Sequence, residues 1–572
     1  MNLSTSSFKQ FGDGIPTKII LTTFFLPLTG FILMYATGFT GSTENTRMFL
    51  STLAGAQAGI LAIVFSVTVI GVQLIATRYS PRMISLFTDS PIFVYTFTLF
   101  VLSIAVDLGL LYTVPSDMSQ IHAAGVGAVS GLGLATAVTL LIFVRTAIKQ
   151  STPDGAIDAF VSDMTSEKYL DQVKRSVENG SETAHPMHPL YNLTMNALSD
   201  GEHVTAGKAV QEYGELVEDV LKELDEEDVF SDDRKVAIQL FKPVFKEHLH
   251  GIALHAEEKE ENRIVSDAIE LQYKLGKKGL DLSTDTVTRD AQFGLSDVLR
   301  DAPVDTGSYI SNSNAWKQLG QLLVDASERP EPGAVRNIAS SIDQNVSRQI
   351  WKVSNVLRYH HSMMRLYSHM ENSHKALLDH YGEELSKVDM EWQYEHVPDN
   401  TPGRERIMAV FKLRQALFST TETFLRYSEQ EDQSPIKVGD LKDSWKNICV
   451  QTSKSPAEDY AISLCQALIE IAVIDHHHDP TGIPWSDTIA RVKHKGDPEI
   501  VDKAFNRIFQ YSYVEEEPGL LIAGETEERY QTYYCNQLNI EDYQPLNTVP
   551  GIDRTLDDIQ RATDERYNTL RS

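Results

Sequence analysis

The chain of 572 residues carries 51 Lys and Arg against 79 Asp and Glu, a formal net charge of −28, and only three Cys. This length exceeds one ordinary domain of ~100–200 residues, so at least two structural units are expected. The acidic balance argues against a nucleic-acid partner, which needs a basic face, and three Cys cannot form a disulfide framework.

The charge is distributed unequally along the chain. Residues 1–150 hold seven basic and five acidic residues, whereas residues 151–572 hold 44 basic and 74 acidic residues, a net charge of −30. The sequence therefore predicts two domains, an almost uncharged one over 1–150 and a strongly acidic one over 151–572.

Long uncharged runs in the first domain predict a bundle of four transmembrane helices. A bilayer core of ~30 Å requires about 20 apolar helical residues. The third run reaches this length only by including Asp107. Removal of the first run as a signal peptide is the alternative, but the run is long for that role and its loss leaves an odd number of spans. The predicted spans are residues 18–39, 52–77, 91–113 and 120–147.

The positions of the basic residues predict the orientation of these spans. With the N-terminus in the cytoplasm, the cytoplasmic side collects six Lys and Arg residues and the opposite side only Arg47. Short cytoplasmic loops of membrane proteins carry an excess of positive charge. We therefore expect a multi-pass protein in the lipid bilayer of the cell membrane, with both termini and the acidic domain in the cytoplasm.

Small residues within the predicted spans indicate how the helices pack, and polar residues are candidates for lining a path through the membrane. Two G-x-x-x-G pairs, Gly55 with Gly59 and Gly127 with Gly131, let membrane helices approach closely. They pack either within the bundle or between the subunits of a homo-oligomer around a central path. The predicted spans carry five polar residues that are candidates for lining such a path: Gln57, Ser66, Thr68, Gln73 and Asp107.

Asp107 is the carboxylate of this set. It lies six residues, about 9 Å of helix rise, from the outer end of its predicted span. A carboxylate at membrane depth indicates ion coordination, proton exchange or pairing with a cation. The depth of Asp107 is shallow enough for hydration at the outer interface, which is the alternative.

An interfacial elbow is predicted after the second span. Ser80 is placed as a helix N-cap with Pro81 at the first helical position, so the spanning helix should end and a short amphipathic helix begin. Arg78 and Arg82 would then lie at the lipid headgroups.

The residues around this elbow carry a family resemblance. The run FSVTVIGVQLIATRYSPRM resembles the signature of a widespread, uncharacterised family of prokaryotic predicted membrane proteins. The matching positions are Phe65, Ser66, Thr68, Gln73, Ser80, Pro81 and Arg82. The resemblance covers about residues 45–115 and implies a multi-span membrane protein with a cytosolic domain, without a settled activity.

The acidic domain is predicted to be mainly helical, which makes the protein all-α. Residues 188–224 and 243–277 each indicate two helices joined by a short loop, and 356–381 indicates one long helix. Stacked helical hairpins and a single irregular helical domain are the two architectures that fit. We expect a buried helix at 461–474, a strand within 519–534 and a loosely attached tail after Pro545.

The acidity of this domain has two interpretations. A domain at −30 repels itself at ordinary ionic strength, whereas molar salt reduces the Debye length to ~3 Å and screens the repulsion. This composition predicts a salt-rich cytosol, as in a halophilic prokaryote of the haloarchaeal kind. The alternative is an acidic vestibule that concentrates cations below a pore.

A cluster at the end of the predicted buried helix is a candidate metal site. His476, His477, His478 and Asp479 carry imidazole and carboxylate groups that suit zinc. Consecutive residues point in different directions, so a polar helix end is the competing interpretation. His360, His361, His369 and His374 of the 356–381 helix are expected to pack at a helix interface. The chain contains no phosphate-binding or nucleophile motif, so we expect no cofactor and lean against an enzyme.

The sequence therefore favours a homo-oligomeric membrane protein with a channel-like or transport role. The second hypothesis is a membrane-anchored sensor or scaffold whose acidic helical domain binds a cytosolic protein partner. The third is a metal-dependent hydrolase tethered to the membrane through the first domain.

Overall fold

All secondary structure that the computed structural model describes is helical, so the prediction of an all-α protein is confirmed. The described residues form two compact units, which belong to Met1–Tyr169 with Pro186–Leu216 and to Leu170–His185 with Val217–Ser572. The structure describes residues 17–38, 42–78, 91–115, 119–178, 185–226, 234–302, 310–329, 331–350, 356–387, 401, 403–430, 438–478, 485–512 and 552–572.

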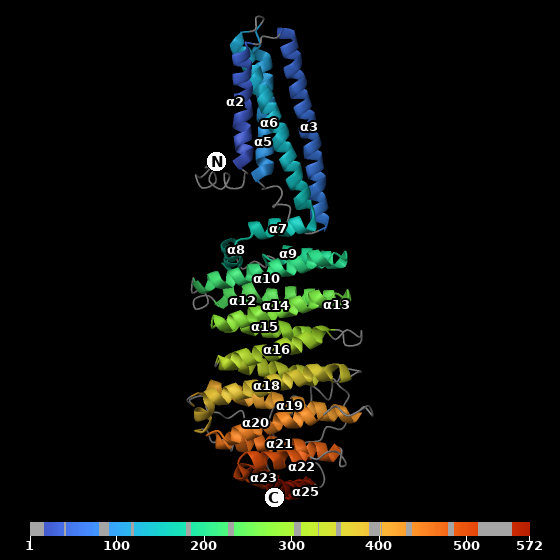
Figure 1. The fold of residues 1–572 in the computed structure, drawn as a ribbon, viewed down its shortest axis with the longest axis vertical. Coiled ribbons are helices and arrows are strands. Elements are labelled where there is room, and N and C mark those ends of the chain that lie inside the picture. Colours follow the sequence, from blue (N-terminus) through green and yellow to red (C-terminus); the bar gives the residue numbers. More distant parts are fainter. Residues whose placement is uncertain are drawn as a thin grey trace. The chain divides into compact units, whose positions relative to one another are not determined.

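Apolar helices form a bundle in the first unit (Figure 1). Stretches in three of them are long and apolar enough to cross a membrane: Thr43–Ile70, Ile92–Thr113 and Gln120–Lys149. The apolar part of the remaining helix, Leu21–Thr37, is shorter. The bundle comprises α2 (Thr17–Thr37), α3 (Thr43–Arg78), α5 (Pro91–Thr113) and α6 (Gln120–Ser151).

Helix α3 begins nine residues before the predicted span. Ser42 caps it, because its hydroxyl accepts a hydrogen bond from the Asn45 amide at 3.3 Å and its carbonyl accepts one from the Thr46 amide at 3.0 Å. A side-chain oxygen at this position satisfies amides that lack a partner within the helix. The predicted span begins later than α3 because hydropathy detects only the apolar part of a helix and not its capped polar start.

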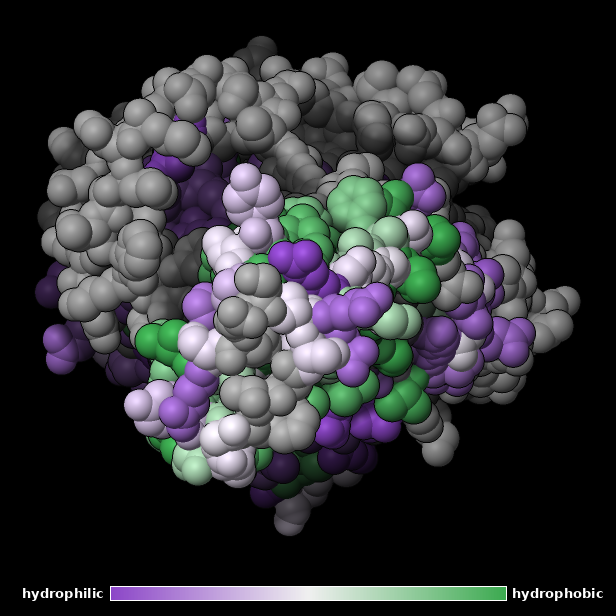
Figure 2. Space-filling view, turned by 90° about the horizontal axis from the view of Figure 1, so that it is seen from above, coloured by the Kyte–Doolittle hydropathy of each residue, from purple (hydrophilic) through white to green (hydrophobic). Residues whose placement is uncertain are grey.

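The bundle is held by close packing, and its outer surface is apolar. Helix α2 packs along α6, and α5 packs on both α3 and α6. Large side chains such as Phe24, Leu33, Ile63 and Leu141 are exposed on the outside of the helices. Figure 2 looks onto the end of the bundle, where hydrophilic residues gather and hydrophobic residues (green) lie along the sides. Such a surface suits hydrocarbon rather than water.

Polar helices follow the bundle within the same unit. They are α7 (Pro153–Asp163), α9 (His188–Ser199) and the first part of α10 (His203–Glu226), while α8 (Ser166–Glu178) and α10 contribute residues to both units. The predicted turn between α9 and α10 is present, and Gly201 occupies it with a φ of 76°, a conformation that favours glycine.

Helices of the second unit form a stack of hairpins in two layers, which is one of the two predicted architectures. Within the stack each helix packs on the helix two positions further along, for example α16 on α18 and α17 on α19. The described helices are α12 (Arg234–Pro243), η2 (Val244–Leu249), α13 (His250–Glu258), α14 (Asn262–Asp281), α15 (Asp285–Asp301), α16 (Ile310–Glu328), α17 (Pro332–Ile350), α18 (Val356–Leu385), α19 (Arg404–Gln430), α20 (Val438–Ser453), α21 (Glu458–His478), α22 (Trp485–Lys495), α23 (Pro498–Ser512) and α25 (Ile552–Arg571).

The core of the second unit lies between these layers. Trp316, Trp445 and Trp485 are fully buried in it. Helix α21 contains the predicted buried segment 461–474, and even its Glu470 is only 1% exposed. The predicted long helix at 356–381 corresponds to α18. The predicted strand within 519–534 lies outside the described residues.

The end of the chain is packed, in contrast to the expected loose tail. Helix α25 packs on α22 and α21, and its Leu556 is fully buried. Lys493 donates hydrogen bonds to Asp502 at 2.5 Å and to Asp564 on α25 at 2.8 Å. The many charges of the tail suggested solvation, but several of them form ion pairs that hold the helix in place.

Candidate functional site

Three polar side chains inside the apolar bundle are buried without a hydrogen-bond partner among the described residues. Gln57 on α3 is 4% exposed, and Ser103 and Asp107 on α5 are 0% exposed. Both oxygens of Asp107, both amide atoms of Gln57 and the hydroxyl of Ser103 lack a hydrogen-bond partner among the described residues. We refer to Gln57, Ser103 and Asp107 as the buried polar cluster.

The packing of α3 on α5 sets the three residues at one level of the bundle. The Arg47 guanidinium donates a hydrogen bond to the Val114 carbonyl at 2.8 Å, and the two helices run antiparallel from there. Gln57 lies ten residues, about 15 Å, beyond Arg47, and Asp107 lies seven residues, about 10 Å, before Val114. Gln57 therefore lies between the levels of Asp107 and Ser103.

Helix α6 closes the cluster from a third side. A Cβ atom added to Gly133 would lie 3.0 Å from Nε2 of Gln57, so the Gln57 amide lies against the α6 backbone. The nearby Thr136 and Thr139 are also buried, but their hydroxyls donate to the carbonyls of Gly133 and Ala135 at 2.7 and 2.9 Å. The three helices thus enclose polar groups that are not bonded to one another.

The chemistry of the cluster is that of an uncompensated carboxylate. No Lys, Arg or His within the described residues forms an ion pair with Asp107. The free-energy cost of burying an ionised carboxylate without a partner is too large for the rest of the fold to offset. The Asp107 carboxylate must therefore be neutralised by a proton or a cation. Complete burial of Asp107 differs from the expected hydration at the outer interface.

The other predicted path residues do not join this cluster. Ser66 is exposed on the outside of α3, and its hydroxyl donates to the Ala62 carbonyl at 3.0 Å. Thr68 is half-buried and donates to the Val64 carbonyl at 2.8 Å. Gln73 is exposed. The structure therefore brings Gln57 and Asp107 to one site and leaves Ser66, Thr68 and Gln73 elsewhere on α3.

The two predicted glycine pairs have different surroundings. A Cβ on Gly127 would overlap the Gly30 carbonyl oxygen, and one on Gly131 would overlap the Leu26 carbonyl oxygen, so both glycines allow α2 to approach α6. In contrast, a Cβ on Gly55 or Gly59 would meet nothing within 4 Å. One pair packs inside the bundle, and the other faces outward.

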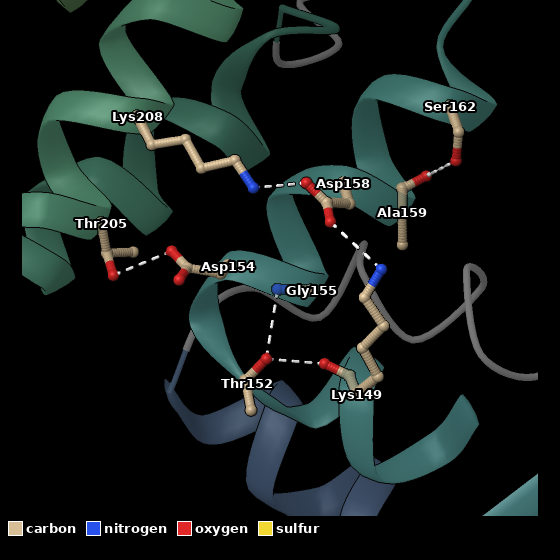
Figure 3. A network of polar contacts seen from close by, with 9 residues as sticks. All are labelled: Lys149, Thr152, Asp154, Gly155, Asp158, Ala159, Ser162, Thr205 and Lys208. Atoms are coloured by element: carbon tan, nitrogen blue, oxygen red, sulfur yellow. Dashed lines mark hydrogen bonds and ion pairs between the residues drawn. The ribbon is translucent and has the colours of Figure 1, made fainter. Parts of the chain in front are cut away.

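A joint of polar contacts lies where α6 passes into α7 (Figure 3). The Thr152 hydroxyl donates to the Lys149 carbonyl at 2.6 Å and accepts from the Gly155 amide at 3.2 Å, which caps α7. Pro153 at the first helical position favours the same start. A Cβ on Gly155 would overlap the Lys149 carbonyl oxygen, so the turn requires glycine.

The joint extends from α7 to α10. The carboxylate of Asp158 forms ion pairs with Lys208 at 2.5 Å and with Lys149 at 3.4 Å, and Thr205 donates to Asp154 at 3.0 Å. The hydrogen bond from Lys208 holds the pKa of the Asp158 carboxyl below its usual range. These contacts link the last turn of α6 to two polar helices.

Sequence reasoning missed several of these residues. In the sequence, Gly30 lies in the middle of the first apolar run, and Ser103 carries a hydroxyl one helical turn before Asp107. These two positions were the signals from which both residues could have been identified. The partners in the joint, Asp158 and Lys208, are about 50 residues apart, and no local pattern predicts their contact.

The predicted elbow and metal cluster are described only in part. Arg78 is the last residue of α3, while Ser80, Pro81 and Arg82 lie outside the described residues. His476 is half-buried in the last turn of α21, the side chains of His477 and His478 are not described, and Asp479 lies outside the described residues. Within the described part of the chain, no group of three or more His, Cys, Asp or Glu could hold a metal ion.

His369 and His374 of α18 pack against neighbouring helices, as predicted, whereas His380 on the same helix is exposed. His374 is 1% exposed, and its Nε2 is 2.7 Å from the hydroxyl of Tyr460 on α21. Burial lowers the pKa of His374 to about 3. His369 lies against Gly320 on α16, where a Cβ would meet its ring at 2.8 Å.

Comparison with known proteins finds a family model that matches the part of the chain containing the apolar helices. Residues 15–201, less than half of the chain, match the model of the family described as "Predicted membrane protein (DUF2254)". No curated protein matches the chain. Together with the apolar helices, the family match supports a membrane protein that resembles an uncharacterised family.

A solved structure, titled "Circular tandem repeat protein with novel repeat topology and enhanced subunit contact surfaces", also matches. It is 14% identical, covers 73% of this chain and 99% of its own length, and has a TM-score of 0.27. A similarity this low carries no argument about fold or function.

Proposed function

We propose that this membrane protein transports a cation through the region between α3, α5 and α6, in a channel-like or carrier role. The observation that carries the proposal is the buried polar cluster, because Gln57, Ser103 and Asp107 lie fully buried without hydrogen-bond partners among the described residues. Ionisable residues inside a membrane are costly and typically mark ion pathways. A bundle that served only as an anchor would be more stable with apolar residues at these positions.

The proposed topology has four spans, with both termini in the cytoplasm of the cell. Helix α2 has 21 residues and a length of about 32 Å, enough for a hydrocarbon core of ~30 Å. The basic residues support the orientation, because Arg145 and Lys149 lie at the end of α6 that the proposal places in the cytoplasm.

The outward face of α3 supports a homo-oligomer. Its small residues Gly55, Ala58, Gly59, Ala62 and Ser66 are exposed at helical spacing. Stripes of small residues allow two membrane helices to approach closely. We propose that this face packs against another copy of the chain. Each assembly would then contain the buried polar clusters of several subunits.

The charge of the second domain supports a salt-rich cytosol. The net charge of −30 over residues 151–572 repels itself unless salt screens it. We propose a halophilic, haloarchaeal origin and assign the FSVTVIGVQLIATRYSPRM run as the signature of the matched family. Screening at molar salt weakens the alternative role of this charge, the attraction of cations to a pore.

A flux measurement on the whole protein tests the transport role. The purified chain is reconstituted into liposomes, and the influx of Na⁺, K⁺ and protons is followed with ion-sensitive dyes. We expect cation flux that Asp107→Asn abolishes and Ser66→Ala, on the outside of α3, leaves unchanged. No flux of any cation above that of empty liposomes would refute the proposal.

A membrane-anchored sensor or scaffold is the second candidate function. The joint supports it, because Asp158 ties the last turn of α6 to α10 through Lys149 and Lys208. A stack of helical hairpins also offers an extended surface for a protein partner. Loss of partner binding without loss of flux in Asp158→Asn would favour this function. A tethered hydrolase gains no support from the described residues, among which no group of three or more His, Cys, Asp or Glu could hold a catalytic metal ion.

A further inference from the structure

We infer that Asp107, Gln57 and Ser103 together bind one sodium ion. This inference rests on the proposed cation transport and names its substrate class. Helices α3, α5 and α6 pack on one another, Gln57 lies against Gly133 of α6, and the helix rise from the Arg47–Val114 contact places Gln57 between the levels of Asp107 and Ser103. None of their polar atoms has a hydrogen-bond partner among the described residues, and buried polar groups in native proteins are almost always bonded to something.

The charge of the region fits a monovalent cation. Asp107 is the sole charged residue of α5, and α3 carries no charge between Arg47 and Arg78. Helix α6 carries no titratable group between His122 and Arg145. One carboxylate therefore faces the cluster, and one positive charge balances it. A divalent ion would leave an uncompensated charge in a medium of low dielectric constant.

The available atoms fit a hard cation better than a proton. The cluster offers the two oxygens of Asp107, Oε1 of Gln57 and the hydroxyl oxygen of Ser103, and oxygen ligands suit hard ions. A proton on Asp107 would neutralise the carboxylate, but its single O–H donates to only one partner, whereas a cation draws on oxygens of all three residues. A coordinated cation accounts for all three residues.

The enclosure favours a small ion. Gly133 lets the α6 backbone lie against the side-chain amide of Gln57, with Nε2 toward Gly133. The Oε1 atom of Gln57 is then left to coordinate the ion. A site with a few protein oxygens suits sodium better than the larger potassium ion, which needs more ligands. The ligating residues are 0–4% exposed, so the ion is enclosed in this conformation and its exchange requires α3 to move relative to α5 and α6.

The test is equilibrium binding of ²²Na⁺ to the full-length protein in lipid nanodiscs, at constant ionic strength maintained with choline chloride. We expect saturable binding of one Na⁺ per chain, with weaker competition by K⁺. Asp107→Asn should abolish binding, and Gln57→Leu and Ser103→Ala should each weaken it by roughly tenfold. Ser66→Ala is the matched control, because its hydroxyl bonds the backbone outside the cluster, and it should bind as the native protein does.

The opposite results overturn the inference. Absence of saturable Na⁺ binding, or native affinity in Asp107→Asn, would show that the cluster is not a sodium site. A cluster neutralised by a proton alone would give no Na⁺ binding and no Na⁺-dependent rise in thermal stability. Should Asp107→Asn fail to fold, native affinity in both Gln57→Leu and Ser103→Ala would refute the site equally.

Binding and flux separate this inference from the proposed function. Sodium binding without cation flux in liposomes would refute the transport role and leave the site standing. Flux without sodium binding would refute the site and leave the transport role standing.

Discussion

Gly30 on α2 and Gly127 on α6 lie against each other so closely that a Cβ on either would overlap the carbonyl oxygen of the other. Gly131 makes the same kind of contact with Leu26 one turn further along α6. In hydrocarbon, where apolar surfaces gain nothing from leaving water, such close backbone contact supplies much of the attraction between helices. Close backbone packing at Gly30, Gly127 and Gly131 therefore joins α2 to α6.

Gly127→Ala is expected to destabilise the bundle, since the added methyl must push α2 away from α6. Overpacking of this kind costs about 1–3 kcal/mol. The measurement is thermal unfolding of the full chain in nanodiscs. Gly109→Ala is the matched control, because the new Cβ meets open space on α5, and it should leave the bundle stable. Equal effects of the two substitutions would contradict the packing described here.

Gly155→Ala is expected to disturb the joint between α6 and α7, because its Cβ would overlap the Lys149 carbonyl oxygen. Hydrogen–deuterium exchange should increase in α7 and in the last turn of α6. Gly207→Ala provides the comparison, since a Cβ there meets nothing within 4 Å and alanine favours a helix by about 1 kcal/mol. Unchanged exchange in Gly155→Ala would show that the turn tolerates a side chain.

His374 is expected to make the second unit sensitive to acid. Its folded pKa of about 3 lies below the ordinary value of about 6.5, so between these values the unfolded chain binds a proton that the folded chain does not. The free energy of unfolding should therefore fall as the pH falls through this window, by up to about 1.4 kcal/mol per pH unit. His374→Gln keeps a polar group near Tyr460 but does not titrate.

Denaturant unfolding of the full chain at pH 7.5 and pH 5 measures this effect. The loss of stability on acidification should be smaller in His374→Gln than in the native protein. His203→Gln, at an exposed position on α10, is the control and should behave as the native protein. The same loss in all three proteins would assign the acid sensitivity to other groups.

Lys493→Met is expected to weaken the docking of α25, since it leaves Asp502 and Asp564 facing each other without their shared cation. Both carboxylates are about half-exposed, so we expect a modest cost of about 1–2 kcal/mol. Faster hydrogen exchange over 552–571 reports the change. Lys503→Met, which removes an exposed pair with Glu458, should leave that exchange unaltered. Protection of α25 in Lys493→Met would show that burial of Leu556 and its neighbours holds the helix alone.

The acidic domain, residues 151–572, is expected to unfold partly at low ionic strength. The net charge of −30 over residues 151–572 is screened at molar salt and unscreened at millimolar salt. Circular dichroism of the full chain should show loss of helix as KCl is lowered, while choline chloride at equal ionic strength restores it. A helical content independent of salt would contradict the proposed adaptation to a salt-rich cytosol.

Local patterns predicted much of the fold. Long apolar runs indicated α2, α3, α5 and α6, and the Asp200–Gly201 turn separated α9 from α10, because both signals lie within one helix or one loop. The docking of α25 was not predictable in this way. Its ion pairs join Lys493 to Asp564, 71 residues further along, and charge alone suggested a solvated tail.

The candidate site was predicted in part for a similar reason. Gln57 and Asp107 stand out as polar residues in apolar runs, which is a property of each residue alone. Ser66 and Thr68 stand out equally, but they bond their own helix, and only the packing of α3 on α5 distinguishes them from Gln57. The outward direction of Gly59 likewise depends on which face of α3 meets the bundle.

The two-layer stack of the second unit has a consequence for how such a protein changes over evolution. Because each helix rests on the helix two positions away, a hairpin can be inserted or lost while its neighbours keep the same kind of contact. The length of this unit is therefore free to vary by whole hairpins. The bundle has no such freedom, since removing α3 or α6, which pack on α5, would expose the buried face of α5 that carries Asp107.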